Sequence, residues 1–260
     1  EDYTNRGSIV TPLKDRIGSQ ILTHYPEDIT TARTITEQET EEAIKTKSNV
    51  YVPDLAKDIL EQISFEAREN DFIDAKSGVS ARLSITAFEN LLSTAERRAL
   101  HNGEEKTSVR LGDFVGIIPS ITGKIELVYE GEQEGVSQVA QQLIADAVNT
   151  IFKEKFPKIE KLTKDGDPDP YAEVVAWFFE ENDFELLDSY TDEEYKNELD
   201  RIIPLQRLIE KYQPETPKKD GYFLKELILW ALAENKKLSK FSIGNGLHFK
   251  DLYGSYISGL

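Results

Sequence analysis

The sequence contains no cysteine, which rules out disulfides, thiolate nucleophiles and thiolate metal sites together. Extracellular scaffolds that depend on disulfides are therefore excluded, and we expect a cytoplasmic protein. Methionine is absent as well and the chain opens at Glu1, so we expect it to be part of a longer protein.

Long apolar runs are also missing. Runs such as Leu227 to Leu232 fall far short of the roughly 20 residues needed to cross a bilayer. We therefore expect a soluble protein without a membrane partner.

Acidic residues outnumber basic residues. The 31 Lys and Arg residues face 48 Asp and Glu residues, which gives a formal net charge of −17. Such a balance repels nucleic-acid phosphates and anionic lipid unless a local basic patch overrides it. The sequence holds no such patch, so we expect no nucleic-acid partner.

The sequence contains no complete zinc-binding or EF-hand motif. Three histidines lie far apart in the sequence and lack the spacing of a zinc site, namely His24, His101 and His248. Asp165, Asp167 and Asp169 resemble the start of an EF-hand loop, but Pro170 stands where the loop requires Gly and Ala176 where it requires Glu. A solvated acidic turn is the better interpretation.

A phosphate-binding loop is missing too. The segment Thr122-Gly123-Lys124 is a near miss, because Ile118 stands where the first Gly belongs and Ile125 follows the Lys in place of Ser or Thr. We therefore expect that this chain alone does not hydrolyse ATP.

Helical periodicity is the strongest positive signal. Apolar residues recur at i, i+3, i+4 and i+7 in several segments and predict one buried face for each. A capping-box pattern at Thr86 and Glu89 marks the start of one of these helices, and Asn102-Gly103 marks its end. The predicted helices are 53–70, 86–101, 137–155, 171–180, 193–208 and 221–233.

Other segments are interpreted from composition. A short helical stretch over 12–18 and a strand over 19–25 are predicted near the start of the chain. The run 130–135 is typical of a flexible acidic loop, and the segment from Ser239 onward is punctuated by Gly and Ser. The aromatic residues of the second half are expected to fill a helical core, namely Tyr171, Trp177, Phe178, Phe179, Tyr222, Phe223 and Trp230.

The segment 6–18 consists of Arg-Gly-Ser-Ile-Val-Thr-Pro-Leu-Lys-Asp-Arg-Ile-Gly. It resembles the stretch after sensor 1 in magnesium-chelatase and MoxR-type AAA+ ATPases, although Ile17 replaces the usual Phe. The resemblance implies that Arg16 is an arginine finger, whose planar, permanently charged guanidinium meets the phosphate oxygens of a neighbouring subunit. Arg6 is a second candidate at the same subunit interface.

The segment 77–84 consists of Ser-Gly-Val-Ser-Ala-Arg-Leu-Ser. It is similar to the motif that opens the sensor 2 helix in the lid of these ATPases. The resemblance implies that Arg82 contacts the γ-phosphate region and couples the nucleotide state to the lid angle.

Each arginine also has a plain structural interpretation. Arg16 could pair with Asp15 on a solvated face, and Arg6 could cap a turn. Arg82 could be a surface residue, although a cation at a helix start opposes the helix dipole.

The resemblance implies a mainly α-helical chain that begins with the remnant of an AAA+ α/β core. Residues 1–48 would be the end of that core and the start of a pre-sensor-2 insertion. Residues 49–160 would form the helical lid with sensor 2. Residues 161–260 would be a helical extension, which resembles nothing that we can name.

The function that the resemblance implies is ATP hydrolysis coupled to remodelling of a partner protein. It implies Mg²⁺ and ATP as cofactors, a homo-oligomeric ring that is a hexamer, and a von Willebrand factor A (VWA)-domain protein as partner. The alternative is a non-hydrolysing helical adaptor derived from an AAA+ protein. A sigma-dependent transcription activator would need a basic DNA-binding helix-turn-helix, and the acidic second half argues against one.

Overall fold

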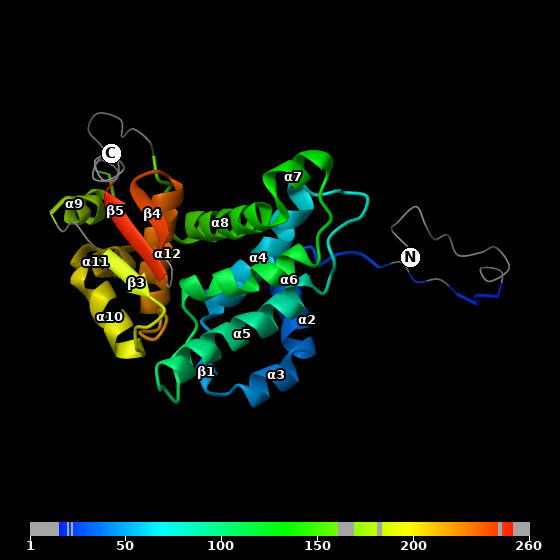
Figure 1. Cartoon of the computed structure of the whole chain (residues 1–260), viewed down its shortest axis with the longest axis horizontal. Coiled ribbons are helices and arrows are strands. Elements are labelled where there is room, and N and C mark those ends of the chain that lie inside the picture. The colour runs from blue at the N-terminus through cyan, green and yellow to red at the C-terminus, as the bar shows by residue number, and fades with distance from the viewer. Residues whose placement is uncertain are drawn as a thin grey trace.

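The structure is a computed structural model, and it describes residues 16–19, 21, 23–160, 169–180, 184–243 and 246–251. The described chain is mainly helical, with two small sheets (Figure 1). None of the helices in these ranges is long and apolar enough to span a bilayer.

The first part of the chain forms a layered helical body. Its elements are α2 (Ile29–Glu39), α3 (Glu41–Thr46), β1 (Val50–Tyr51), α4 (Asp54–Glu69), α5 (Leu83–His101), β2 (Thr107–Ser108), the 3-10 helix η1 (Leu111–Ile117), α6 (Ile118–Thr122), α7 (Tyr129–Glu134) and α8 (Val136–Lys155). Strands β1 and β2 pair in parallel.

The second part combines helices with a small sheet. Its elements are α9 (Ala172–Glu180), β3 (Phe184–Leu187), α10 (Asp192–Arg201), α11 (Ile203–Tyr212), α12 (Gly221–Glu234), β4 (Leu238–Ile243) and β5 (Gly246–Asp251). The sheet order is β3-β5-β4 and both pairings are antiparallel.

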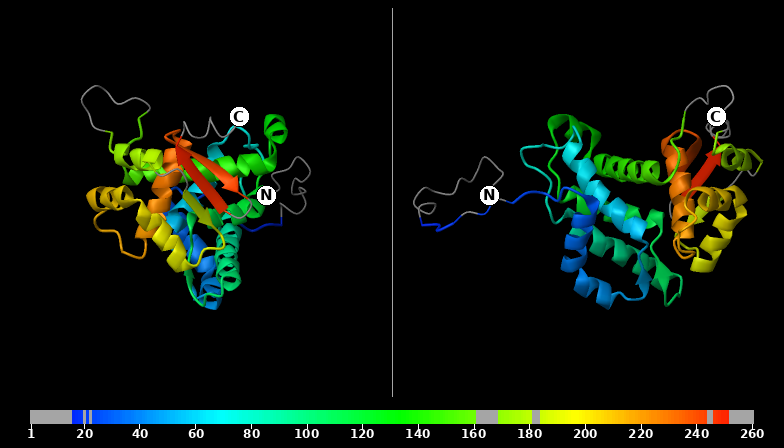
Figure 2. Two further views of the ribbon diagram at one scale, coloured as in Figure 1. Left: turned by 60° about the vertical axis from the view of Figure 1, so that its left-hand side comes forward. Right: turned by 180° about the vertical axis from the view of Figure 1, so that it is seen from behind.

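The predicted helices over 53–70, 86–101 and 137–155 are confirmed as α4, α5 and α8. Helix α4 buries Ala56, Ile59, Leu60 and Ile63 on one face, as the spacing of these residues predicts. Helix α8 packs against α4 on one side and against α12 on the other, so it links the two parts of the chain (Figure 2).

One hydrophobic core runs through both parts, from Val50 to Phe249. The aromatic residues of the second half belong largely to it. Tyr171, Phe178, Phe223 and Trp230 are buried, whereas Phe179 is 52% exposed. Trp177 and Tyr222 are partly buried and pack against the core. The core prediction is therefore confirmed for these six residues and wrong for Phe179. The division of the chain at residues 48 and 160 stays a prediction.

The predicted strand over 19–25 is not formed in its described residues. Residues 19, 21 and 23–25 have no regular secondary structure, and Ile21 is 86% exposed. A strand needs a neighbour for its backbone N–H and C=O groups, and no described strand lies beside this segment. The helical stretch over 12–18 is likewise absent at residues 16–18, and 12–15 lie outside the described residues.

Two helix boundaries differ from the sequence prediction. Helix α5 begins at Leu83, not at Thr86, because the turn at Ser80 accepts the Leu83 N–H at 2.9 Å and Leu83 itself is buried. The helix predicted over 193–208 is divided at Ile202 into α10 and α11. Pro204 explains the division, because proline lacks the N–H that a continuous helix requires.

Two segments are more regular than their composition suggests. The acidic run at 130–135 contributes to α7, which ends at Gly135, where φ is +92°. The residues from Ser239 onward that the structure describes, 239–243 and 246–251, lie in β4 and β5. In β5, buried and partly exposed residues alternate, as expected for a strand with one face on a core.

Buried charged side chains join α5 to η1. Arg98 on α5 donates from Nε and from Nη2 to the two carboxylate oxygens of Asp113, each at 2.9 Å, and both side chains are 5% exposed. Arg98 also donates to the Thr107 hydroxyl and to the Ser108 carbonyl. This bidentate geometry satisfies a guanidinium that has lost its water.

Glu226 on α12 continues this network into the second part of the chain. Its carboxylate accepts the backbone N–H groups of Leu111 at 2.8 Å and Gly112 at 2.9 Å. The Tyr195 hydroxyl donates to it at 2.7 Å. Burial raises the pKa of Tyr195 well above its usual value, so the hydroxyl keeps the proton that it donates. The first turn of η1 is therefore held by a carboxylate more than 100 residues away in the sequence.

Replacement of Arg98 by Ala should lower the free energy of unfolding by about 3–5 kcal/mol, because it leaves the Asp113 carboxylate buried without its partner. Urea unfolding measures the change. Arg97→Ala is the matched control, because Arg97 is the exposed neighbour of Arg98 on the same helix. It should shift stability by less than about 0.5 kcal/mol. Equal effects of the two substitutions would contradict the assigned role of the buried pair.

Candidate functional site

The loop between α4 and α5, residues 70–82, is held by the segment that follows α6. Ile73 forms an antiparallel bridge with Leu127. The Asp74 N–H donates to the Glu126 carbonyl at 2.9 Å, and the Ser80 N–H to the Lys124 carbonyl at 3.3 Å. The main chain of residues 124–127 therefore fixes the loop that leads into Arg82.

Tyr25 fastens the same loop from the other side. Its hydroxyl donates to the Val79 carbonyl at 2.7 Å and accepts the Val79 N–H at 3.1 Å. Next to it, Gly78 has φ +70°, and a Cβ at this position would lie 2.9 Å from the Tyr25 hydroxyl oxygen. Glycine is needed here for both its backbone conformation and its lack of a side chain.

Arg68 on α4 lies beneath Tyr25. Its guanidinium carbon is 4.1 Å from the centre of the Tyr25 ring and 4.8 Å from that of Phe65. Burial lowers the pKa of Arg68, and its Nε has no hydrogen-bond partner among the described residues. Such cation–π contacts are worth about 0.5–2 kcal/mol and hold the ring over the end of α4.

A groove of about 780 Å³ opens where these segments meet. Its lining comes from three stretches of the chain, residues 23–25, 77–81 and 123–126. Val79 and Ile125 form its buried base, and Lys124 contributes a cation. Within the described chain, the Lys124 ammonium has no hydrogen bond or ion pair.

Arg82 directly follows the groove lining. It is the N-cap residue of the 19-residue helix α5, and its side chain is exposed. Its backbone N–H donates to the Ser80 hydroxyl at 3.3 Å. No carboxylate pairs with its guanidinium in the part of the chain that the structure describes. The predicted position of Arg82 at a helix start is confirmed.

Of the other two predicted arginines, the structure describes Arg16. Arg16 lies in an exposed turn of the segment that extends away from the helical body (Figure 1). It does not line the groove. Arg6 lies outside the described residues. The finger role of Arg16 and the interface role of Arg6 stay predictions.

The start of α5 is supported by polar groups buried against α4. The Ser64 and Ser84 hydroxyls lie 2.8 Å apart, and both residues are buried. Glu61 is 3% exposed on the same face. Burial raises the pKa of Glu61, and hydrogen bonds from Thr36 and Ser84 partly oppose this shift.

Sequence reasoning missed two members of the groove. Lys124 belongs to the failed phosphate-loop match at 122–124, where the spacing of Gly residues gives no reason to retain it. Tyr25 stands at the end of the predicted strand, which assigns it no role. In the fold, both lie next to the loop that carries Arg82. Neither juxtaposition is visible in the sequence, because Tyr25 and Val79 are 54 residues apart.

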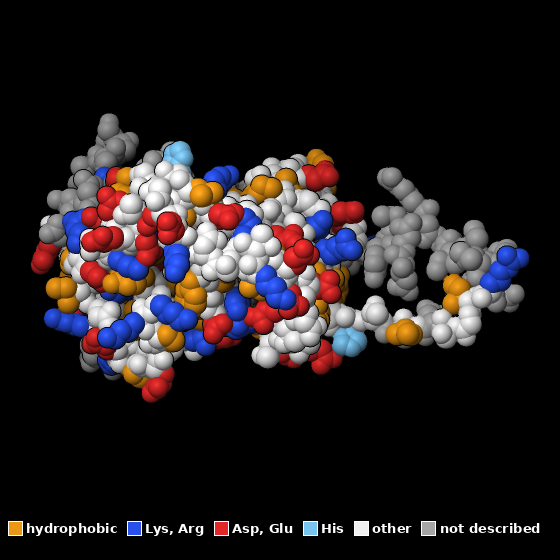
Figure 3. Space-filling view, turned by 90° about the horizontal axis from the view of Figure 1, so that it is seen from below, with side chains coloured by type: hydrophobic (Ala, Val, Ile, Leu, Met, Phe, Trp, Pro, Cys, Tyr) orange, Lys and Arg blue, Asp and Glu red, His pale blue; other side chains and the backbone are white. Residues whose placement is uncertain are grey.

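Outside the groove, the surface carries charges of both signs. On the face shown in Figure 3, acidic and basic side chains are interspersed. In the ranges that the structure describes, no group of three or more His, Asp or Glu side chains is arranged to hold a metal ion.

Gly78→Ala should destabilise the protein more than Gly103→Ala. Both glycines have φ near +70°, where alanine costs about 1–2 kcal/mol. Only Gly78 would also press a Cβ against Tyr25, because nothing lies within 4 Å of a Cβ at Gly103. A double-mutant cycle with Tyr25→Phe, followed by urea unfolding, isolates the extra cost. That extra cost should disappear when Tyr25→Phe is also present, and its persistence would contradict the hydroxyl contact.

Glu61 should make the protein less stable as the pH rises above its usual pKa of 4.5. Its folded-state pKa is raised, so the folded state retains a proton that the unfolded state releases, and stability present at low pH is lost as the pH rises through the folded value. With Glu61→Gln, the free energy of unfolding should fall less steeply as the pH rises above 4.5. Glu105→Gln, at an exposed position, should not change this slope. Parallel pH profiles for wild type and Glu61→Gln would refute this assignment.

Comparison with protein-family models, with curated protein sequences and with solved structures finds no match to this chain. The function proposed for the groove therefore depends on its geometry and on the two short motifs at 6–18 and 77–84.

Proposed function

We propose that this chain is the lid-bearing C-terminal region of a ring-forming AAA+ ATPase of the magnesium-chelatase subunit I and MoxR type. In this proposal the ring, a hexamer, couples ATP hydrolysis to remodelling of a partner protein with a VWA domain. The phosphate-binding loop and the Mg²⁺ ligands belong to a preceding core. Arg16 acts as the finger that reaches the nucleotide of a neighbouring subunit, with Arg6 at the same interface.

The observation that carries the proposal is the setting of Arg82. A cation at a helix N-terminus is unfavourable by a few tenths of a kcal/mol unless an anion compensates it. Arg82 occupies this position on α5 without a carboxylate partner among the described residues, beside an open groove. A bound triphosphate would supply the missing negative charge.

Lys124 supports the same interpretation. Lys124 lines the groove and Arg82 directly follows its lining, and the two residues stand on segments that backbone hydrogen bonds hold together. A planar guanidinium binds phosphate through paired N–H donors, whereas a compact ammonium binds it as a point charge. Two such cations, on two segments that hydrogen bonds join, suit a polyphosphate with its several anionic groups better than they suit a single carboxylate.

The lid role follows from how the loop is held. The Tyr25 hydroxyl, bound to both polar groups of Val79, connects the segment before α2 to the loop before α5. A change of angle between a preceding core and the helices would therefore act on Arg82 through this link. That coupling is what a nucleotide-driven machine requires.

Arg82→Ala should lower the ATPase rate of the longer protein that this proposal requires by roughly 10- to 100-fold, the loss expected for a charge-assisted contact to the transferring phosphate. Arg97→Ala, on the same helix and exposed, should leave the rate unchanged. Steady-state ATP hydrolysis measures both. An adaptor without hydrolysis would show no rate to lose, and an unchanged rate in Arg82→Ala would refute the sensor role.

Arg16→Ala should reduce turnover by on the order of a thousandfold or more if Arg16 acts on a neighbour's nucleotide. Mixing this variant with one whose phosphate-loop Lys is replaced should restore part of the activity. In mixed rings an intact finger then serves an intact nucleotide site. Mixed assembly without any rescue would count against a finger that acts between subunits.

A further inference from the structure

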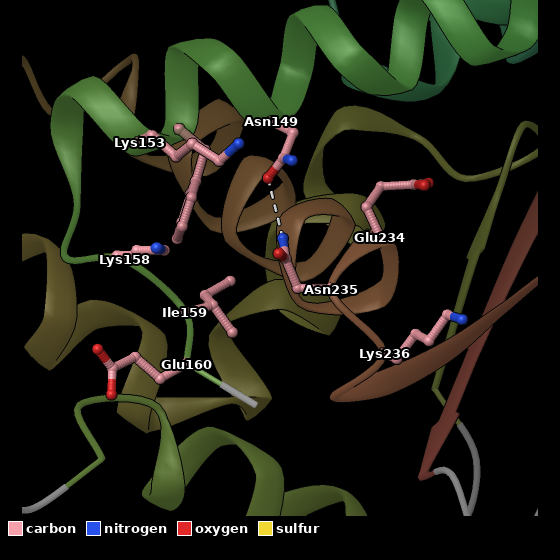
Figure 4. A pocket seen from close by; sticks show the side chains of 9 residues that line it. Asn149, Lys153, Lys158, Ile159, Glu160, Glu234, Asn235 and Lys236 are labelled. Carbon is pink, nitrogen blue, oxygen red and sulfur yellow. Dashed lines mark hydrogen bonds between the residues drawn. The ribbon is translucent and has the colours of Figure 1, made fainter. Parts of the chain in front are cut away.

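A second cavity, remote from the Arg82 groove, lies where α8 and α12 end. It has a volume of about 530 Å³, within the range of about 300–1,000 Å³ that holds small molecules. Its wall comes from the last turns of α8 and α12 and from residues 158–160 (Figure 4).

Three lysines surround this cavity, Lys153, Lys158 and Lys236. None of them has an ion pair or a side-chain hydrogen bond with any residue that the structure describes. In Figure 4 the ammonium groups of Lys153 and Lys158 point inward from one wall, whereas the Lys236 ammonium and the carboxylates of Glu160 and Glu234 point away from the cavity. Glu234 is already paired with Lys240 at 2.8 Å. The cavity is therefore locally cationic in a chain of net charge −17.

The backbone at Lys236, at the edge of the cavity, is left-handed. Asn235 caps α12, and the N–H groups of Lys236 and Lys237 donate to the carbonyls of Ala233 and Leu232, as in a Schellman motif. The left-handed position of this motif usually belongs to Gly, but Lys236 holds it with φ +57°. It is the one non-glycine residue with positive φ in the described ranges. A lysine here costs about 1–2 kcal/mol relative to glycine.

The rest of the lining is suited to an amphipathic ligand. Phe152 and Ile159 are buried and give the cavity an apolar base. The Asn149 side-chain carbonyl accepts the Asn235 amide at 2.9 Å, which leaves the Asn149 NH₂ group as a donor. An apolar body would pack on the base, and an anionic group would meet the two inward ammonium groups.

We propose that this cavity binds a small organic phosphate, with its phosphate between Lys153 and Lys158 and its apolar part against Phe152 and Ile159. Lysine binds phosphate as a point charge from several directions, which suits two ammonium groups on one wall of the cavity. The inference does not depend on ATP hydrolysis, because the cavity and the Arg82 groove share no lining residue.

The test is an NMR titration of the 260-residue chain with phenyl phosphate at low ionic strength. Saturable shifts at the Asn149 and Asn235 amides, with a millimolar or lower dissociation constant, are expected. Lys153→Ala and Lys158→Ala should each weaken binding by roughly tenfold or more, as expected for loss of a charged hydrogen bond. Lys106→Ala, at an exposed position outside the lining, should leave it unchanged.

Two further arms separate ligand binding from a structural role. Benzyl alcohol tests whether the anion is needed, and benzoate tests whether a carboxylate suffices. Lys236→Gly should raise the midpoint of thermal unfolding, because it relieves the left-handed backbone, and should leave phenyl phosphate binding unchanged, because the Lys236 ammonium points away from the cavity (Figure 4). If the lysines only balance the dipoles of the helix ends, Lys153→Ala and Lys158→Ala would alter stability and leave the dissociation constant unchanged.

The proposal is overturned by absence of saturable binding at millimolar phenyl phosphate, by equal affinities in wild type and Lys153→Ala/Lys158→Ala, or by equal affinities for phenyl phosphate and benzyl alcohol. Tighter binding of benzoate than of phenyl phosphate would reject the phosphate and favour a carboxylate ligand.

Discussion

A charged group can remain in a protein interior only if the chain supplies the partners that water supplied before folding. That constraint governs the junction of this molecule. Arg98 is satisfied by Asp113, and Glu226 receives two backbone N–H groups at the start of η1 and a tyrosine hydroxyl from α10. These partners come from α5, η1, α10 and α12, so the two parts of the chain share one polar junction in addition to their continuous apolar core.

The groove beside Arg82 is held by exposed and partly buried hydrogen bonds and not by buried charged groups. Its walls are held by the backbone bridge between Ile73 and Leu127 and by two hydrogen bonds between the Tyr25 hydroxyl and the main chain of Val79. Tyr25 and Ser77 hold the loop through their side chains, whereas the side chains of Arg82 and Lys124 make no hydrogen bond or ion pair with the residues that the structure describes. Arg82 and Lys124 can face a ligand because other atoms hold the loop in place.

Much of the helical framework could be predicted, because α4, α5 and α8 each repeat apolar residues at the spacing of one helical face. The position of Arg82 could be predicted as well, because a short motif places it before a helix. Tertiary pairing could not be predicted. The Tyr25–Val79 and Lys124–Ser80 contacts join segments far apart in the sequence, and β3 and β5 form only because residues 184–187 meet 246–249. Apolar periodicity alone misleads at Pro204, where the missing N–H ends one helix and starts the next.

The order of the small sheet affects how the chain acquires its structure during synthesis. β5 lies between β3 and β4, yet it is the last of the three strands to leave the ribosome. Until residues 246–251 emerge, β3 and β4 have no partner for their backbone groups, because they pair with β5 and not with each other. Assembly of this sheet is thus a late event in biogenesis, and a nascent chain that stops before Gly246 presents two unpaired strand edges to other molecules.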